Sequence, residues 1–496
     1  MGYGKCSQPL FVGKPALPKK LPPVNIPKHP FLAPQGKNGM HSDSYISGTY
    51  QWSGPLGNNP RVKSSSLSIL GGLMATLAVD SKGRLIGVSG NLFDFKLLLL
   101  DPETLEILAS HSLPQRESTR KFWRTLDMRV IMKDTSGGAY FHLDKNDRPI
   151  VVNSNRVIQI FKIEQTNAKF SWKVEKEYDL NTALSKNALV TDAMPDWKGR
   201  IWFVTRSAVV GLVYTDTGII KTLKLPGEEI QNAMAVAEDG VYIVSDHALY
   251  RFEADTKTGV PHFTWREKYD RGTSIKPGSV NQGCGTTPTL LSDGLIAITD
   301  NSDSRDNVCI YNRLPGQRGR RLICKIPVFD ENRSVSENSL IGYGKSVIVE
   351  NNYFYTSGLP TDFNPKTHAG VTRIDVNKNN RGCKVIWESR EASQTVVPKM
   401  STGNGLIYLY TRSKSTPDSI LSWYLTALDF RTGKTVFKIF TGTGQLWNNT
   451  WAPITIAPDG TLYVGVYNGI ISIKDGETDR PRREINGCIY SNKKNI

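Results

Sequence analysis

Short stretches of alternating apolar and polar residues recur along the chain, and each is followed by a turn sequence. The clearest example lies near the C-terminus, where residues 423–440 read WYLTALDFRTGKTVFKIF. The alternation runs into a tight turn at 431–434, and a second alternating run follows it. Residues 451–475 repeat the arrangement, with turns at 458–460 and 468–469. A period of two between glycine-containing turns predicts antiparallel β-meanders.

The same strand–turn–strand unit recurs every ~40–60 residues, a spacing typical of propeller blades. The units begin near residues 73, 125, 186, 231, 283, 337, 396 and 453. The last unit has room for three strands rather than four, so we assign residues 61–69 to the strand that completes it. The pattern predicts an all-β, eight-bladed β-propeller of four-stranded antiparallel blades, closed by an N-terminal strand. Seven blades is the alternative count.

Three regions follow from this pattern. Residues 1–60 are rich in proline, glycine and lysine and lack periodicity, which predicts an extended N-terminal arm. Residues 61–475 form a single propeller domain, and residues 476–496 form a basic C-terminal tail. His41-Ser42-Asp43, within the arm, lacks the surroundings of a nucleophile elbow and is interpreted as arm structure that packs against the ring.

Composition narrows the class of partner. Hydrophobic residues make up 39% of the chain, and no apolar run reaches the ~18 residues of a membrane span. The net charge of +16 is concentrated at the two ends, which are expected to solubilise the chain or to contact an acidic surface. No motif with interleaved basic and aromatic residues indicates a nucleic-acid partner. We expect a monomer.

The six cysteines contain no CxxC pair, so the spacing of a zinc site is absent. The order of the repeats pairs Cys284 with Cys309, Cys324 with Cys383, and Cys6 with Cys488 at the chain ends that a closed ring brings together. Three disulfides predict a secreted protein or another oxidising compartment. No secretory leader follows the first residue, so the printed chain is interpreted as a mature form.

The segment ALDFRTGKTVF at 427–437 resembles the blade motif of PQQ-type quinoprotein dehydrogenase propellers. Weaker copies are LLLLDPETLEIL at 97–108 and TDTGIIKTL at 215–223. The resemblance implies a propeller, and the chain is also similar to secreted proteins of unassigned function with quinoprotein-like propellers. Phe437 stands where the dehydrogenases usually carry tryptophan, and no vicinal cysteine pair is present to cover a quinone. We therefore do not expect PQQ as cofactor.

The loops between blades, and the loops between the second and third strands, lie on one face of a propeller. Read together these loops are polar, whereas the loops of the opposite face are ordinary turns. Asparagine and aspartate are also common turn formers, so each residue has a structural alternative. A polar funnel at the channel mouth is nevertheless the expected ligand site. The expected substrate-binding residues are Asn187, Asn232, Asn338, Asn351, Arg206, Arg412, Asn449 and Trp451.

Glu337, Glu350 and Lys399 are the strongest candidates for acid–base chemistry, because they adjoin apolar strands and are not turn formers. A structural ion pair between the lysine and either glutamate is the equal alternative. Asp300 and His247, each at the end of a strand, complete the expected catalytic set.

Aspartates are concentrated in TDNSDSRDN at 299–307, and oxygen-rich loops of this kind suit Ca²⁺. The spacing does not match an EF-hand loop. Asp300 and Asp303, with Glu350 from the next blade, are the candidate calcium ligands; no cofactor is otherwise required.

These observations predict a secreted propeller enzyme that acts on a small organic or carbohydrate substrate by acid–base chemistry of the hydrolase, lyase or isomerase type. The alternative is a non-catalytic propeller that binds a small ligand or a glycan in the same funnel. A PQQ-dependent dehydrogenase is the third hypothesis.

Overall fold

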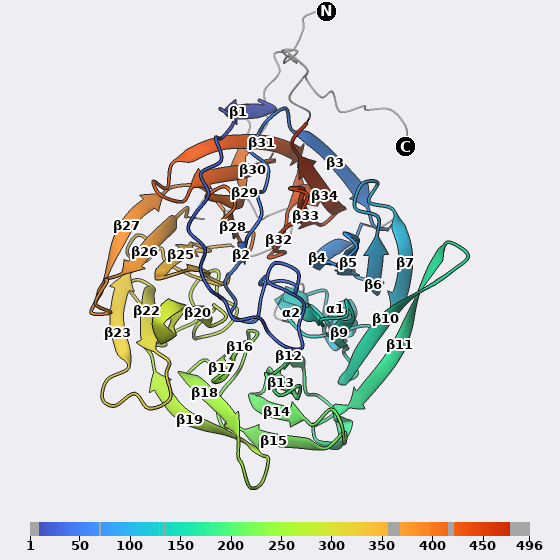
Figure 1. The fold of residues 1–496 in the computed structure, drawn as a ribbon, viewed down its shortest axis with the longest axis vertical. Helices are drawn as coiled ribbons and strands as arrows, with labels where there is room; N and C mark the ends of the chain where they lie inside the picture. The colour runs from blue at the N-terminus through green and yellow to red at the C-terminus, as the bar shows by residue number, and fades with distance from the viewer. Residues whose placement is uncertain are drawn as a thin grey trace, which may run out of the picture.

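The computed structural model describes residues 9–68, 71–127, 129–132, 134–355, 368–393, 395–414 and 421–476. Eight antiparallel sheets stand like blades around a central axis (Figure 1). The protein is therefore an all-β, eight-bladed β-propeller, and the predicted blade count is confirmed.

The blades follow the chain in order. The first four are β4 (Leu73–Val79), β5 (Leu85–Gly90), β6 (Phe95–Leu100) and β7 (Ile107–Ser112); β8 (Phe141–Leu143), β9 (Pro149–Val152), β10 (Val157–Thr166) and β11 (Lys169–Asp179); β12 (Val190–Pro195), β13 (Ile201–Thr205), β14 (Val209–Val213) and β15 (Ile220–Lys224); and β16 (Ala235–Ala237), β17 (Gly240–Val244), β18 (Ala248–Ala254) and β19 (Pro261–Lys268). The next three are β20 (Thr289–Leu291), β21 (Leu295–Thr299), β22 (Asn307–Asn312) and β23 (Leu322–Pro327); β24 (Ile341–Tyr343), β25 (Ser346–Glu350), β26 (Val371–Val376) and β27 (Cys383–Ser389); and β28 (Lys399–Ser401), β29 (Leu406–Lys414), β30 (Leu421–Asp429) and β31 (Thr435–Thr443). The eighth contains β32 (Ile454–Ile456), β33 (Leu462–Val466), β34 (Gly469–Lys474) and β3 (Arg61–Ser66).

The N-terminal strand β3 completes the last blade. It pairs antiparallel with β34, from Arg61 opposite Lys474 to Ser66 opposite Gly469. This confirms the predicted closing strand, and β3 is the outermost strand of blade 8. The Asp475 carboxylate, just after β34, accepts the backbone N–H groups of residues 56–58 at 2.7 to 3.0 Å and fastens the two segments together.

The hairpin turns of the first three blades share one device. An aspartate at the start of the turn accepts the backbone N–H groups two and four residues ahead and pairs with the arginine four residues ahead. The pairs are Asp80 with Arg84, Asp144 with Arg148 and Asp196 with Arg200. These turns lie on the face that we call the lower face, and the loops between blades lie on the upper face.

Tryptophans on outer strands lock neighbouring blades together. Trp387 of β27 packs on Gly433, whose φ of +68° and missing Cβ leave room for the indole ring. The indole N–H also donates to the Phe430 carbonyl at 2.9 Å. Trp265 of β19 makes the equivalent bond to the Arg313 carbonyl at 3.3 Å. The turn at residues 429–433 of blade 7 is therefore a packing surface for blade 6.

One disulfide also links two blades. Cys324 on β23 is bonded to Cys383 on β27, as predicted. The predicted Cys284–Cys309 bond is wrong, because both cysteines are free and buried. The Cys284 thiol lies 3.2 Å from both oxygens of Thr286 instead. Cys6 and Cys488 lie outside the described residues.

The described part of the N-terminal arm, residues 9–60, crosses the lower face and then enters the central channel (Figure 1). β1 (Phe11–Gly13) pairs with the outer strand of blade 7. The Leu21 N–H then donates to the Thr402 carbonyl, and Tyr343 donates to the Pro22 carbonyl at 2.6 Å. Leu32 forms a bridge with Asp144 at the edge of blade 2.

We call residues 39–50 the plug, because they fill the channel. Their backbone bonds or bridges to the innermost strands of blades 2, 4, 5, 6 and 7 through His142, Val236, Leu290, Gly342 and Met400. The plug ends in β2 (Thr49–Tyr50), which runs parallel to β28. Ile46 is fully buried within it at a φ of 60°, a conformation that a β-branched residue adopts only where its surroundings enforce it.

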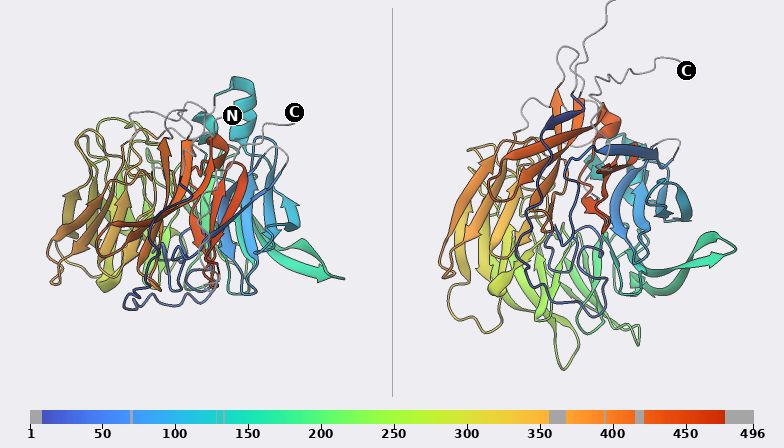
Figure 2. Two further views of the ribbon diagram at one scale, coloured as in Figure 1. Left: turned by 90° about the horizontal axis from the view of Figure 1, so that it is seen from above. Right: turned by 45° about the horizontal axis from the view of Figure 1, so that its top comes forward.

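The upper face carries a helical insertion between blades 1 and 2. It contains α1 (Glu117–Thr125) and α2 (Arg129–Met132), which stand on the face opposite the arm (Figure 2). Three 3₁₀ turns, η1 (Leu180–Thr182), η2 (Ser292–Gly294) and η3 (Gln445–Trp447), complete the described elements. Among the described residues, no helix combines the length and apolar character that crossing a bilayer requires.

Candidate functional site

A cavity of about 850 Å³ opens on the upper face beside α1. Met40 of the plug contributes to its lining, so the plug separates the cavity from the lower face. The predicted ligand site at the channel mouth therefore coincides with a cavity, but the cavity is not a uniformly polar funnel. Most of its lining is apolar: Leu73, Ala75, Phe93, Phe95, Phe122, Leu126, Ile131, Leu446 and Trp451.

One polar group of the lining comes from the loops that enter blades 4 and 6, and further polar side chains, such as Asn91, Arg116 and Asp134, come from other segments. Gln231 and Asn232 precede β16, and Glu337 and Asn338 precede β24. Ring closure brings these two loops together although about a hundred residues separate them in the chain, as expected for inner loops of a propeller. Four predicted site residues thus share one cavity: Asn232, Asn338, Trp451 and Glu337.

Glu337 is a tuned carboxyl group at the cavity wall. Its Oε2 accepts from the Gln231 amide at 2.8 Å, and its Oε1 accepts from the Val280 backbone N–H at 3.2 Å. Burial raises the pKa of Glu337 to about 7, and these hydrogen bonds limit the rise. The Asn352 side chain accepts the Glu337 backbone N–H at 2.6 Å and fixes the loop. This carboxyl can therefore exist protonated or ionised near neutral pH.

Glu350 and Lys399 lie deeper than Glu337 and do not line the cavity. Asn338, which does line it, donates to Glu350 Oε1, and Ser393 donates to Oε2 at 3.0 Å. Burial raises the pKa of Glu350 to about 8 and lowers the pKa of Lys399 to about 7. Within the described residues no carboxylate lies within 4.0 Å of the Lys399 ammonium, so the alternative of a direct ion pair with Glu337 or Glu350 is not seen there.

The plug adds titratable groups next to Lys399. Asp43 accepts from the Ser47 hydroxyl at 2.5 Å and from the Tyr45 backbone N–H at 2.9 Å, and burial raises its pKa to about 6. His41 is buried with neither ring nitrogen hydrogen-bonded, and burial holds its pKa well below the ordinary value. The interpretation of 41–43 as arm structure packed against the ring agrees with these contacts.

The other expected substrate-binding residues lie outside the cavity. Asn351 bonds to the backbone of residues 333, 335 and 353 and shapes its own loop. Arg206 pairs with Glu229 at 3.2 Å, and Asn187 is exposed at a turn. Asn449 and Arg412 are buried beside their own blades, and Asn449 donates to the Gly465 carbonyl at 2.7 Å. These positions support the structural alternative for loop residues of this type.

His247 is also remote from the cavity. Its Nδ1 lies 2.9 Å from Asp246, whose other carboxylate oxygen accepts from Arg271 at 2.6 Å. His247 and Asp246 therefore belong to a hydrogen-bonded network that holds the loop containing Arg271 against the upper edge of blade 4.

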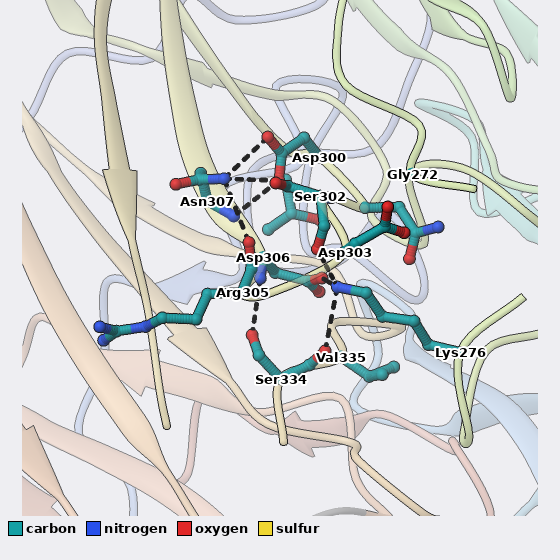
Figure 3. Close-up of polar contacts among 12 residues, drawn as sticks. Gly272, Lys276, Asp300, Ser302, Asp303, Arg305, Asp306, Asn307, Ser334 and Val335 are labelled. Carbon is teal, nitrogen blue, oxygen red and sulfur yellow. Dashed lines mark hydrogen bonds and ion pairs between the residues drawn. The ribbon is translucent and has the colours of Figure 1, made fainter. Parts of the chain in front are cut away.

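Two lysines neutralise the aspartate-rich loop at 299–307, and Figure 3 shows one of them, Lys276. The Asp306 carboxylate lies 2.6 Å from the Lys276 ammonium, which also donates to the carbonyls of Ser302 and Ser334. Lys325 pairs with Asp300 at 2.8 Å. Asp303 instead accepts from the backbone of Thr273 at 2.8 Å.

The described residues bring together no group of three His, Cys, Asp or Glu side chains that could hold a metal ion. Glu350, the third expected ligand, points to Asn338 and Ser393 and away from this loop. The residues present therefore do not fit the expected calcium site, because the buried Lys276 and the partly exposed Lys325 supply the positive charge that the metal would have supplied.

The cavity also fits PQQ poorly. Of the described residues that line it, Arg116 alone is basic, whereas an anionic quinone needs several cationic partners. The Arg116 guanidinium is already stacked 4.4 Å from the Phe95 ring and donates to the Asp134 carbonyl at 3.1 Å.

The sequence analysis did not identify the apolar wall or the insertion between blades 1 and 2 that contributes to it. Arg116, Phe122, Asp134 and Tyr140 reach the cavity from the insertion between blades 1 and 2. The long interval between β7 and β8 was the available signal, since blades are usually joined by short loops. Gln231 was missed because only its neighbour Asn232 had been selected from the same loop.

No protein-family model matches the chain. An uncharacterized protein of Archaeoglobus fulgidus is 26% identical over 306 residues, which are 55% of this chain and 58% of that protein. The chain thus matches less than two thirds of the length of this relative.

Similar solved structures are themselves β-propellers. BamB from Moraxella catarrhalis has a TM-score of 0.45 and 12% identity, over 85% of this chain and 100% of that chain. A streptogramin B lyase structure has a TM-score of 0.39 and 12% identity, over 84% of this chain and 98% of that chain. Fold similarity of this degree carries no information on substrate or partner.

Proposed function

We propose that this propeller binds a small amphipathic organic molecule in the upper cavity. The observation that carries the proposal is the division of the cavity lining. Apolar side chains from blades 8 and 1 and from α1 provide most of the lining, with polar side chains such as Asn91 and Arg116 interspersed among them, and Gln231, Asn232, Glu337 and Asn338 form a polar group on the side of blades 4 and 6. A molecule with an apolar body and a hydrogen-bonding end matches both sides.

The size of the cavity is consistent with this class of ligand. Its volume of about 850 Å³ lies within the ~300–1,000 Å³ typical of small-molecule sites. Such sites are predominantly apolar with a few placed polar groups, as here. The extent of the apolar wall favours an organic ligand over the glycan of the alternative hypothesis, since sugars present hydroxyl groups over most of their surface.

The binding proposal is tested with N-phenylnaphthylamine, a neutral dye whose fluorescence rises in an apolar site. The full chain should bind it saturably, and Ala75→Phe, which places a ring in the cavity, should weaken binding at least about tenfold. Ala183→Phe, at the cap of η1, is the matched control and should bind as the wild type does. Equal binding by both variants would contradict the proposal.

A second candidate is an acid–base enzyme, and the environment of Glu337 favours it. A carboxyl with a pKa of about 7 that opens onto a cavity is suited to donate or accept a proton at neutral pH. In this form the protein would act on its bound organic molecule by hydrolase, lyase or isomerase chemistry, with Glu337 in place of the larger predicted set.

Glu337→Gln separates the two functions, because it keeps the shape and one of the two acceptor oxygens but cannot ionise. An enzyme should lose at least about a hundredfold in turnover, the usual effect of a general acid or base, with dye affinity retained. Turnover unchanged in the variant would eliminate this role. A secreted location is part of both proposals and is supported by the Cys324–Cys383 bond, since such bonds persist in oxidising compartments.

A further inference from the structure

Large apolar side chains are exposed together at the rim of the cavity. Phe93, Trp123, Leu126 and Leu446 are 55%, 47%, 72% and 60% exposed. They come from three separate segments: the β5–β6 loop, the end of α1 and η3. The rings of Phe93 and Trp123 lie 5.3 Å apart, so the first two segments meet in one patch. We call these four residues the rim.

The rim is bordered by positive charge. Arg120, Lys121 and Arg124 are exposed on α1, and Glu117 is the one acidic residue of that helix. Arg120 lies 3.3 Å from Glu117, and among the described residues no carboxylate lies within 4.0 Å of the Lys121 or Arg124 side chain. The helix stands clear of the ring on the upper face, so a flat surface would meet it first (Figure 2).

We infer that the rim and the basic residues of α1 seat the protein on an anionic lipid surface. Exposed tryptophan, phenylalanine and leucine beside arginine and lysine form the side-chain set that inserts at a lipid interface while the cations pair with headgroups. Lipid is favoured over a protein partner because the patch is small, projecting and positively charged, and complements a diffuse negative surface.

The rim also forms part of the cavity. Phe93, Leu126 and Leu446 line the cavity and are also exposed at its opening. A protein seated through these residues would open its cavity toward the lipid, and an apolar ligand would enter without crossing water. This entry route rests on the proposed function, whereas docking on lipid does not.

Co-sedimentation with vesicles tests the docking. The full chain should bind vesicles made of equal amounts of phosphatidylcholine and phosphatidylglycerol, and salt should release it. It should bind vesicles of pure phosphatidylcholine more weakly. Trp123→Ser/Leu126→Ser should lower the affinity for vesicles at least about tenfold, since each substitution removes an apolar side chain that would insert into the membrane. Lys121→Gln/Arg124→Gln should lower it roughly tenfold on anionic vesicles alone. Leu126→Ser/Leu446→Ser leaves the α1 aromatic contact intact and should repeat the loss.

The matched control is Ile219→Ser/Leu314→Ser, which removes two exposed apolar residues from turns of the lower face. It should bind vesicles as the wild type does. Binding that is unchanged in the rim variants would assign it to the basic chain ends and overturn the inference. Self-association lost in the rim variants, without vesicle binding, would overturn it in favour of a protein contact.

N-phenylnaphthylamine binding in the absence of vesicles keeps the two proposals apart. Rim variants that no longer bind vesicles but still bind the dye would support both the lipid docking and the ligand-binding function of the cavity. Wild-type protein that binds vesicles but no dye upholds docking and contradicts the cavity function.

Discussion

The Gln231 side-chain amide donates a 2.8 Å hydrogen bond to Glu337 Oε2 across 106 residues of sequence. The bond joins the entry loop of blade 4 to the entry loop of blade 6 beside the cavity. At this position burial raises the pKa of Glu337 to about 7, and the side chain still faces the cavity. The ionisation of one side chain is therefore coupled to what the cavity holds.

Binding of an anionic ligand should depend on pH through Glu337. Above pH 7 its carboxylate repels the anion, and below pH 7 it is neutral, so affinity for anilinonaphthalene sulfonate should rise as pH falls from about 8 to about 6. A change of roughly tenfold is expected for charges a few ångströms apart. Titration by fluorescence measures it.

Glu337→Gln should show a nearly constant affinity over the same range. Glu103→Gln, at an exposed turn, should keep the wild-type profile. A pH dependence that survives in the cavity variant would assign the effect to another group.

Stability should fall with rising pH because of Glu350. Its folded pKa of about 8 lies above the ordinary value of 4.5, so between these values the unfolded chain is ionised while the folded protein holds the proton. The free energy of unfolding therefore falls by up to about 1.4 kcal/mol per pH unit from this group. Relative to the wild type, Glu350→Gln should become more stable as pH rises from about 5 to about 8, measured by urea unfolding.

Lys399 should act in the opposite direction and at higher pH. Its folded pKa of about 7 lies below the ordinary 10.5, so the unfolded chain binds the proton more tightly between these values and wild-type stability rises with pH there. Lys399→Met should lack this rise. Parallel stability curves for Lys399→Met and wild type from about pH 7 to about pH 10 would show that the buried lysine is not tuned.

The disulfide between blades 5 and 6 should be a large single contribution to stability. It spans 59 residues of chain, and replacing both partners by Cys324→Ser/Cys383→Ser should lower the free energy of unfolding by about 2–4 kcal/mol in guanidinium. Cys284→Ser/Cys309→Ser is the comparison, and it should remove both of those free thiols from a titration of denatured, unreduced protein. Failure of these thiols to react before reduction would contradict their free state.

The plug should unfold with the ring and not before it. Tyr45 is buried in the channel and donates to Glu238 at 2.6 Å. Tyr45→Phe, which loses that bond, should cost about 1 kcal/mol, and Tyr45→Ala, which leaves a cavity, about 3–5 kcal/mol.

Leu17→Ala, at an arm residue that is itself 81% exposed, should change stability by less than about 0.5 kcal/mol. Cleavage of the arm by protease at wild-type rates in Tyr45→Ala would show that the plug is not part of the cooperative fold.

The local sequence pattern was sufficient to predict the propeller scaffold. Alternation and glycine turns depend on neighbours in the chain, so the blades, their number and the closing strand at Arg61–Ser66 were readable from the sequence. The same holds for Glu337, which stood out as a charged residue next to an apolar strand.

Pairings across the ring were decided by the tertiary structure alone. Lys276 neutralises Asp306, so an aspartate-rich loop that resembled a calcium site contains a buried ion pair. Residues 39–50 carry no periodic signal, yet they fill the channel because the inner strands of blades 2, 4, 5, 6 and 7 present backbone groups to them. The apolar wall arises where the end of α1 meets the β5–β6 loop of blade 1 and where side chains of the loop entering blade 8 line the same cavity. These features depend on distances between segments far apart in the chain, which a one-dimensional pattern does not contain.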